Sequence, residues 1–401
     1  MEIGDKCHKV ALVAGTRPEI IKLYPIMKLL DEQKIQYTFI FTGQHYSFNL
    51  FMNFIKEFKV KSPDFFIDLN YPDDAISQFS MLITEIGKIL KLSQPSSVII
   101  VGDTNSVIAT ALTASKLRIP IIHIEAGLRS YDWKMQEEYN RRATDHISDL
   151  LFAPTKEAIL VLEKEKVQGQ IYLVGNTVID AIRICLESNM EKFDNNGHSE
   201  LSKYEEIVMG SENYVLLTLH REENVNNAHN LKTVLEVLSE FDFNCIFPVH
   251  PHTLQKLKEF DLDKFTGKNL KIIDPVGYID FVRLMKNCQF VITDSGGIQE
   301  EITAPQINKK ALVLRNSTER YESLLSGHAV LCNVEYIAMK NAINNILNSL
   351  PVFQSKPSDC PYGDGYSAEK IIEVLKKGAL VPLHERVMPR RMDHIGQMSP
   401  S

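Results

Sequence analysis

Short apolar runs alternate with longer amphipathic segments along most of this chain, and almost every run stops at glycine or polar residues. Runs of this length and composition are typical of strands that are buried on both faces of a sheet. When strands and helices alternate at this spacing, the strands pair in parallel and the helices cover both faces. We expect strands at 10–14, 37–42, 97–101, 119–122, 150–153, 171–174, 214–219, 245–249, 270–273, 290–293 and 311–314.

The chain is long enough, at 401 residues, for two domains with sizeable cores. Residues 187–211 are polar and poorly patterned, which favours an interdomain connection there. We therefore predict two Rossmann-like, doubly wound parallel-sheet domains, 1–186 and 187–375, which face each other across a cleft. The segment 376–401 is expected to pack back on the first domain or to be partly disordered.

Composition narrows the classes of function. The net charge of −7 and the pI near 6.0 argue against a dedicated nucleic-acid binder. The chain begins without a signal sequence and holds no apolar run of membrane-spanning length, so we expect a cytoplasmic protein. Six scattered cysteines without a Cys-x-x-Cys pair favour buried free thiols over disulfides or a zinc site.

Charged residues crowd the end of the fourth apolar run. Glu125 follows that run directly, Asp132 lies in the loop beyond it, and Glu137 and Glu138 begin a charged helix. Ligands of open parallel sheets bind outside the carboxyl ends of strands, so this crowding favours a functional site over a solvated loop.

Helical periodicity predicts which face of that charged helix is buried. Tyr139, Ala143 and Ile147 share one face, with Leu150 beyond them, and we expect this face to pack inward. Glu137 and Arg141 lie four apart on the opposite face, where they can pair with each other or contact a ligand.

Three further strand ends in the first half carry candidate residues. After the first strand, a Gly15 turn leads into a helix with Pro18 in its first turn, and its free N–H groups, with Arg17 and Lys22, form a candidate anion site. After the third, Asp103 either caps the next helix or belongs to the site. His45 follows the second strand and is expected beside a substrate or holding its loop, since no second metal ligand stands at a suitable spacing.

The expected strands of the second half also end at polar residues and glycines. Ser295, Gly296 and Gly297 precede a helix and form the strongest candidate phosphate site, because glycine permits close backbone approach; the alternative is a simple helix cap on a tight turn. Glu301 falls one turn further, placed to accept from sugar hydroxyls, and Arg320 can neutralise a diphosphate. His220 is either a buried structural imidazole or a ligand contact that carries a proton.

These motifs together resemble one family. The chain carries Gly-Thr-Arg-Pro-Glu at 15–19, Thr-Gly-Gln-His at 42–45, Gly-Asp-Thr at 102–104, His-Ile-Glu-Ala-Gly-Leu-Arg at 123–129, Glu-Glu-x-Asn-Arg at 137–141, His-Arg-Glu-Glu-Asn at 220–224, Ser-Gly-Gly-Ile-Gln-Glu-Glu at 295–301, Thr-Glu-Arg at 318–320 and Pro-Tyr-Gly-Asp-Gly at 361–365. The set is similar to that of the non-hydrolysing UDP-N-acetylglucosamine 2-epimerases, from about residue 9 to 375.

The resemblance implies a glycosyltransferase-B-like pair of domains, usually dimeric, with UDP held mainly by the second. It implies interconversion of UDP-GlcNAc and UDP-ManNAc without metal, nicotinamide or any other cofactor. The reaction eliminates UDP to give a 2-acetamidoglucal and adds it back, with the proton returned to the opposite face of C2. By position, Asp103, Glu125 and Glu137 correspond to the family's catalytic carboxylates, and His220 to its catalytic histidine. Residues that match nucleotide-sugar contacts are Arg17, Lys22, Arg141, His250, Ser295, Gly297, Glu301 and Arg320.

The chain departs from the family pattern at a few positions. Gln136 and Tyr321 stand where the family usually has proline, and Ile302 and Thr303 look like a small insertion. These changes spare the catalytic carboxylates but can alter the sugar accepted. The open alternatives are an epimerase of a diacetamido-uronate or L-sugar nucleotide, a hydrolysing epimerase, a glycosyltransferase of the same fold and a non-catalytic sugar-nucleotide sensor.

Overall fold

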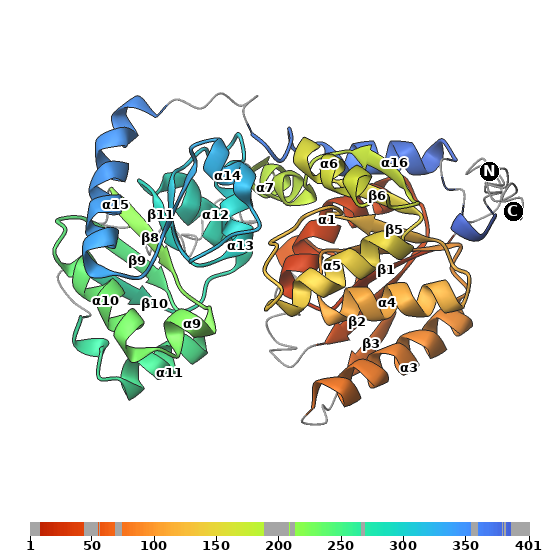
Figure 1. Ribbon diagram of the computed structural model, residues 1–401, viewed down its shortest axis with the longest axis horizontal. Helices are drawn as coiled ribbons and strands as arrows, with labels where there is room; N and C mark the ends of the chain where they lie inside the picture. Colours follow the sequence, from red (N-terminus) through yellow and green to blue (C-terminus); the bar gives the residue numbers. More distant parts are fainter. Residues whose placement is uncertain are drawn as a thin grey trace, which may run out of the picture.

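Two parallel sheets organise the protein into two lobes, as Figure 1 shows. The computed structural model describes residues 9–43, 55, 57–68, 74–187, 208, 213–265, 269–353, 360–378, 380 and 382–385. His45, nearly all of the expected connection at 187–211 and the end of the chain from 386 lie outside these residues. Every strand pairing within the two sheets is parallel, which confirms the predicted fold class.

The first lobe has a seven-stranded sheet with the order β3-β2-β1-β4-β5-β6-β7. Its strands are β1 (Val10–Ala14), β2 (Tyr37–Gly43), β3 (Phe65–Asp68), β4 (Ser97–Val101), β5 (Ile121–Ile124), β6 (Leu150–Ala153) and β7 (Gln170–Leu173). The strand order reverses between β1 and β4, so the loops that follow these two strands diverge and leave a crevice at the carboxyl edge.

The second lobe repeats this plan with six strands in the order β10-β9-β8-β11-β12-β13. Its strands are β8 (Tyr214–Thr218), β9 (Asn244–Pro248), β10 (Leu270–Ile273), β11 (Val291–Thr293), β12 (Ala311–Leu314) and β13 (Ala329–Cys332). Its order reverses between β8 and β11. The edge strands β3 and β13 were not among the strands expected from sequence.

Helices cover both faces of each sheet. Those of the first lobe are α1 (Arg17–Glu32), α3 (Ala75–Ser93), α4 (Asn105–Lys116), α5 (Gln136–Ile147), α6 (Lys156–Lys164) and α7 (Thr177–Glu187). Those of the second are α9 (Glu222–Val225), α10 (Ala228–Ser239), α11 (Pro251–Glu259), η1 (Asp263–Phe265), α12 (Tyr278–Asn287), α13 (Gly296–Glu301), α14 (Tyr321–Leu325), α15 (Tyr336–Ser349) and η2 (Leu350–Val352). None of the helices in the described ranges is long and apolar enough to cross a bilayer.

One apolar core runs from the first lobe into the second. Alternate residues of β1 point to opposite faces, so Leu12 packs on the α1 side while Val13 packs against α3 and α4. Helix α7 contacts α12 and α13 of the other lobe, and their apolar side chains belong to the same cluster as Leu12. The lobes are therefore joined by buried apolar packing as well as by the chain itself.

Polar contacts also bridge the lobes. The carboxylate of Glu57 accepts from the backbone N–H groups of Tyr278 and Ile279, at 3.2 and 2.9 Å, in the first turn of α12. The Thr155 hydroxyl donates to the carboxylate of Glu322 at 2.7 Å. These contacts fix the positions of the loops that face each other across the gap.

Helix α16 (Ser367–Lys376), which the short 3-10 helix η4 (Leu383–Glu385) follows, returns to the first lobe and packs against α1 and α7. Tyr362, Ala368, Ile371 and Ile372 are buried in the shared core, and Asp180 of α7 accepts from the backbone N–H of Ala368 at 2.7 Å. The chain therefore returns to the first lobe before residue 376, which is the point where the sequence suggested that the return would begin.

Candidate active site

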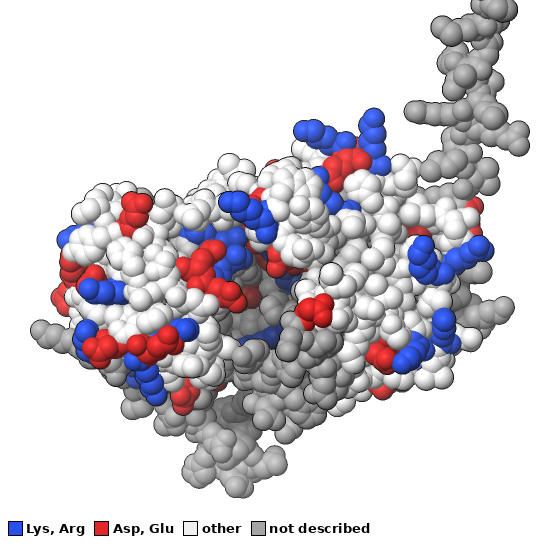
Figure 2. Space-filling model, turned by 60° about the horizontal axis from the view of Figure 1, so that its bottom comes forward, with Lys and Arg blue, Asp and Glu red and all other residues white. Residues whose placement is uncertain are grey.

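The loops at the two reversal points carry four of the candidate residues. In the first lobe the loop after β1 leads to Arg17, and the loop after β4 carries Asp103. In the second lobe His220 follows β8 and Ser295 follows β11. Figure 2 shows charged side chains of both signs around the hollow between the lobes. The sheet topology thus brings the polar strand ends of the two halves to one gap.

A buried group of charges spans that gap. We call Lys22, Glu125, Glu300 and Arg320 the interlobe cluster. The ammonium of Lys22 lies 2.6 Å from Glu125 Oε2 and 3.3 Å from Glu300 Oε2. The guanidinium of Arg320 reaches Glu125 Oε1 at 3.0 Å and Glu300 Oε1 at 2.9 Å. Each lobe therefore supplies one cation and one carboxylate, and each cation contacts both carboxylates.

Burial and mutual attraction set the charges of this cluster. Burial alone would raise the pKa of Glu125, but Lys22 and Arg320 hold it well below its usual range. Burial raises the pKa of Glu300, and the nearby carboxylate of Glu125 adds to that rise. Glu125 is thus the ionised member of the carboxyl pair, while Glu300 is the one that takes up a proton more readily.

The backbone at Glu125 is unusual for a glutamate. Its φ is +69°, in the left-handed region that side chains other than glycine seldom adopt. Gly102, at the end of β4, has a φ of +85°, and a Cβ there would lie 3.6 Å from Glu125 Oε2. The ends of β4 and β5 therefore place Glu125 beside the turn that carries Asp103. Left-handed backbone at a non-glycine residue is frequent at functional sites.

Asp103 is held by α5. Arg141 donates to Asp103 Oδ2 from Nε at 2.8 Å and from Nη2 at 2.7 Å. The side-chain amide of Asn140 donates to the backbone carbonyl of Asp103 at 2.9 Å. The Asp103 side chain is 25% exposed, so it is accessible from the gap while its position is fixed.

The predicted buried face of α5 was wrong for Tyr139 and Ala143, although Ile147 is half-buried and Leu150, beyond the helix, is buried. Tyr139 is 50% exposed and Ala143 is exposed, whereas the buried residues of the helix are Glu138, Asn140, Arg141, Thr144 and Asp145. The buried face is polar because it packs against the loops of the site. Its charges find partners there, as with Asp145, which contacts His123 at 2.8 Å and Arg129 at 2.7 Å.

The two glutamates that begin α5 have different surroundings. Glu138 is buried and accepts from the backbone and hydroxyl of Ser130 and from Arg141 and Arg142, so it shapes the loop before the helix. Glu137 is exposed, and within the described part of the chain it forms no hydrogen bond or ion pair with Arg141, one of the two roles open to it from sequence. It lies one helical turn before Arg141 and is open to a ligand. Asp132 accepts from the backbone of Lys134 at 3.0 Å, a local contact within its loop.

The expected anion site at the start of α1 is occupied by the protein itself. Glu19 Oε2 accepts from the backbone N–H of Gly15 at 2.6 Å and of Thr16 at 3.0 Å. Those two donors are therefore taken by a buried carboxylate and do not face a ligand. Arg17 is exposed and Lys22 belongs to the interlobe cluster, so the positive charge predicted here comes from side chains alone.

In the second lobe, His220 is paired with a buried carboxylate. Its Nδ1 lies 3.1 Å from Asp294 Oδ1, and its side chain is 53% exposed. Asp294 also accepts from the backbone N–H groups of His220 and Arg221. Burial alone would raise the pKa of Asp294, but its contacts with neighbours, chiefly His220, lower it overall. The imidazole is oriented and open to solvent, which excludes the buried structural role. His250 lies at the start of α11, where burial lowers its pKa and the charges of His252 and His220 add to the effect.

The Ser-Gly-Gly turn forms the start of α13, with Ser295 at the N-cap position. A side chain at Gly296 would collide with Glu319, because a Cβ there would lie 2.9 Å from Glu319 Oε1. This steric constraint was not apparent from the sequence. A Cβ at Gly297 would meet no atom closer than 4.0 Å, so that position faces open space. Glu301 is buried and accepts from the Tyr278 hydroxyl at 3.0 Å, and burial raises its pKa.

Sequence reasoning missed several charged residues of the site. Three buried carboxylates lie against predicted residues: Glu300 against Arg320, Glu319 against Gly296, and Asp294 against His220. Each stands next to a predicted residue in the sequence, so proximity along the chain was the available signal. Arg315, which pairs with Glu319 at 3.0 Å, directly follows the strand expected at 311–314, so its place at a strand end was the available signal.

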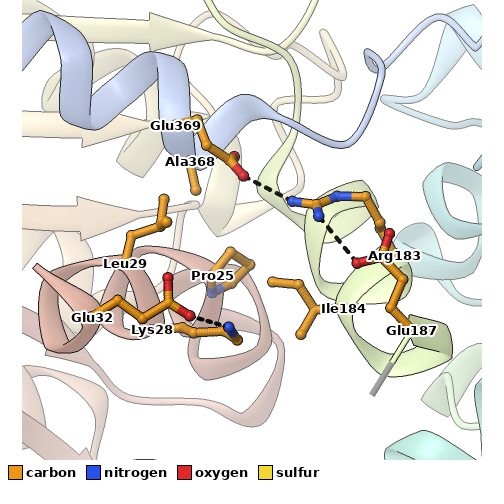
Figure 3. Close-up of a pocket in the computed structure, with 9 residues that line it drawn as sticks. All are labelled: Pro25, Lys28, Leu29, Glu32, Arg183, Ile184, Glu187, Ala368 and Glu369. Atoms are coloured by element: carbon orange, nitrogen blue, oxygen red, sulfur yellow. Dashed lines mark hydrogen bonds and ion pairs between the residues drawn. The ribbon is translucent and has the colours of Figure 1, made fainter. Parts of the chain in front are cut away.

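Another hollow lies between α1, α7 and α16, as Figure 3 shows. Arg183 pairs there with Glu369 at 2.9 Å and with Glu187 at 3.3 Å, and Lys28 pairs with Glu32. None of the predicted site residues lines it, so we place the site in the interlobe gap. Among the described residues, no His, Cys, Asp and Glu side chains are grouped in a way that could hold a metal ion.

Comparison with known proteins agrees with this geometry. Residues 27–376 match the family described as UDP-N-acetylglucosamine 2-epimerase. The UDP-N-acetylglucosamine 2-epimerase of Methanocaldococcus jannaschii is 40% identical over 377 residues, which cover 92% of this chain and 99% of the relative.

Solved structures show the same relationship. The crystal structure of the Methanocaldococcus jannaschii UDP-GlcNAc 2-epimerase in complex with UDP-GlcNAc and UDP has a TM-score of 0.80 at 37% identity, and the match covers 92% of this chain and 100% of that one. Acinetobacter baumannii MurG, at 10% identity and a TM-score of 0.54 over 92% and 99% of the two chains, shares the glycosyltransferase-B-like fold alone. By the extent of these matches, the chain belongs to the UDP-N-acetylglucosamine 2-epimerase family.

Proposed function

We propose that this protein is a non-hydrolysing UDP-GlcNAc 2-epimerase, which interconverts UDP-GlcNAc and UDP-ManNAc. The observation that carries the proposal is the interlobe cluster, in which two cations and two carboxylates meet between the lobes beside Asp103. The proposed reaction needs cations for a leaving diphosphate and carboxyl groups for proton transfer at one place.

The proposed reaction has two balanced steps. A base removes the hydrogen at C2 as the bond from C1 to the UDP oxygen breaks, which leaves 2-acetamidoglucal and UDP. UDP then adds back to C1 while an acid delivers a proton to the opposite face of C2. We assign the acid and base roles to Asp103, Glu125 and Glu137, and we assign His220 to the catalytic set as an imidazole oriented by Asp294.

We assign diphosphate binding to Lys22 and Arg320, with Arg17, Arg141, His250 and the Ser295–Gly297 turn as further contacts. Lys22 and Arg320 also hold Glu125 in its ionised form. A diphosphate that recruits these two cations therefore weakens their hold on Glu125 and makes that carboxylate a stronger base. In this way substrate binding itself prepares the carboxylate for proton abstraction.

We also propose that the protein acts as a homodimer in the cytoplasm and supplies precursors for surface polysaccharide. The cytoplasmic assignment is supported by the cysteines, because Cys185, Cys245, Cys288 and Cys332 are buried free thiols and Cys360 is a half-buried one. Free thiols are typical of a reducing compartment.

The proposed function is tested by product analysis. UDP-GlcNAc is incubated with the purified protein and no other substrate, and the nucleotide sugars are separated and identified by NMR. We expect a mixture of UDP-GlcNAc and UDP-ManNAc that also forms when the reaction starts from UDP-ManNAc. Release of free ManNAc and UDP in equal amounts would identify a hydrolysing enzyme instead.

A further inference from the structure

The site contains a buried carboxylate to which the proposed chemistry gives no role. Glu19, in the first turn of α1, is 4% exposed and belongs to neither the interlobe cluster nor the diphosphate contacts. Its Oε2 accepts from the backbone N–H groups of Gly15 and Thr16, at 2.6 and 3.0 Å, and its Oε1 accepts from the hydroxyl of Thr104 at 2.6 Å. This one side chain therefore joins the loop after β1 to the loop after β4.

The two loops are packed too closely for this contact to be incidental. A Cβ on Gly15 would lie 2.2 Å from the hydroxyl oxygen of Ser106 and 2.6 Å from that of Thr42, and these two hydroxyls are themselves hydrogen-bonded at 2.7 Å. The turn after β1 thus lies directly on the first turn of α4. Glu19 adds a carboxylate that three donors hold in one position.

The residue next to Thr104 is Asp103. Asp103 is held on its other sides by Arg141, through its carboxylate, and by Asn140, through its backbone carbonyl. The bond from Thr104 to Glu19 is the contact that ties the following residue to α1. Without it, the turn at 102–104 keeps its hydrogen bonds from the α5 side but loses the one that joins it to α1.

We propose that Glu19 is a positioning residue, which holds Asp103 in place through the hydroxyl of Thr104. Glu19 does not touch the substrate, and its effect on turnover rests on the proposed epimerase function of Asp103. A shift of an acid or base by a fraction of an ångström lowers the rate of proton transfer while leaving nucleotide binding intact.

The position of Glu19 requires a side chain of that length. Aspartate keeps the charge but is one methylene shorter, so it cannot contact Thr104 and the two backbone donors together. Glutamine keeps the length, and its amide can bond to the same groups, because the Thr104 hydroxyl can accept as well as donate. Burial raises the pKa of Glu19 to about 7, which agrees with an uncharged side chain being tolerated here.

The test combines three variants and a matched control. Thr104→Val removes the hydroxyl that Glu19 accepts from, at the N-cap position of α4. Thr110→Val makes the same change inside α4, where the hydroxyl donates to the Ser106 carbonyl at 2.7 Å. We expect Glu19→Asp and Thr104→Val to lower kcat for UDP-GlcNAc epimerisation by about tenfold, with KM within about twofold of wild type. Glu19→Gln and Thr110→Val should keep kcat within about twofold.

Amide hydrogen exchange of the segment 101–105 gives a readout that does not depend on activity. We expect faster exchange in Glu19→Asp and Thr104→Val, and wild-type exchange in Thr110→Val. If wild type does not turn over UDP-GlcNAc, the proposed function fails, and the exchange data alone decide whether Glu19 holds the loop. Wild-type kcat and wild-type exchange in Thr104→Val would overturn the proposal, as would a loss in Glu19→Gln equal to that in Glu19→Asp.

Discussion

Glu125 shows how a single residue can be recognised in the sequence while its chemistry stays hidden. Its position after a buried strand and before a charged loop marked it as a candidate. Its two cations, Lys22 and Arg320, stand 103 and 195 residues away in the chain. No periodicity links such distant residues, so the low pKa of Glu125 could not be foreseen from sequence.

The carboxylates give the first prediction at this scale. Asp103→Asn, Glu125→Gln and Glu137→Gln should each lower turnover by about 10²–10⁴-fold, because each removes a proposed acid or base. UDP binding, measured by calorimetry, should be largely unchanged. In Glu125→Gln it should be equal or tighter, since the variant frees Lys22 and Arg320 for the diphosphate. Wild-type turnover in all three variants would refute the assignment of these residues.

Arg320 gives the second prediction. Arg320→Ala should weaken UDP binding by about tenfold or more, because it removes a cation assigned to the diphosphate. It should also lower the free energy of unfolding by about 3–5 kcal/mol, since Glu125 and Glu300 then lose a buried partner. The control is Arg183→Ala, which breaks ion pairs outside the interlobe gap. Equal UDP affinity in Arg320→Ala and wild type would contradict its role.

At the scale of elements, sequence patterns predicted most strands well. The strands at Val10–Ala14 and Ser97–Val101 lie where they were expected. The error on α5 has a physical cause: a helix that packs against charged loops buries a polar face, and apolar periodicity then indicates the wrong side. Strands β3 and β13, each a four-residue edge strand, were missed, whereas β7 and β10, which have the same length and also lie at sheet edges, were expected.

The contact between α7 and α16 gives the third prediction. Burial raises the pKa of Asp180 to about 6, above the ordinary value of 3.8. Well below pH 3.8 the carboxyl is protonated in both the folded and the unfolded protein. Between pH 3.8 and about 6 it ionises in the unfolded protein but stays protonated in the folded one, so stability falls across this window and remains lower at higher pH. Asp180→Asn lacks this cost.

Unfolding of wild type and Asp180→Asn should therefore be compared at pH 4.5 and pH 8. The difference in unfolding free energy should shift in favour of the variant by about 2 kcal/mol at the higher pH. Glu187→Gln, at an exposed position of the same helix, should show no such shift. A constant difference between Asp180→Asn and wild type at both pH values would contradict this account of the contact.

For the whole molecule, the alternation of strands and helices was enough to predict two parallel-sheet lobes facing a gap, with the candidate residues along their strand ends. The contacts that fix one lobe against the other were not predictable in this way. These contacts join segments that are far apart in the chain. Glu57 accepts hydrogen bonds from the start of α12, Thr155 donates to Glu322, and α16 packs back on the first lobe. They depend on how complete elements pack, which local patterns do not encode.

The central claim is that a sugar nucleotide held between the lobes loses and regains the hydrogen at C2. The direct measurement is NMR of UDP-GlcNAc incubated with the protein in deuterated water, without any acceptor. The account predicts that deuterium enters C2 of UDP-GlcNAc as UDP-ManNAc forms, with no build-up of free UDP. A C2 position that keeps its hydrogen through many turnovers, or a sugar that is released from UDP, would contradict it.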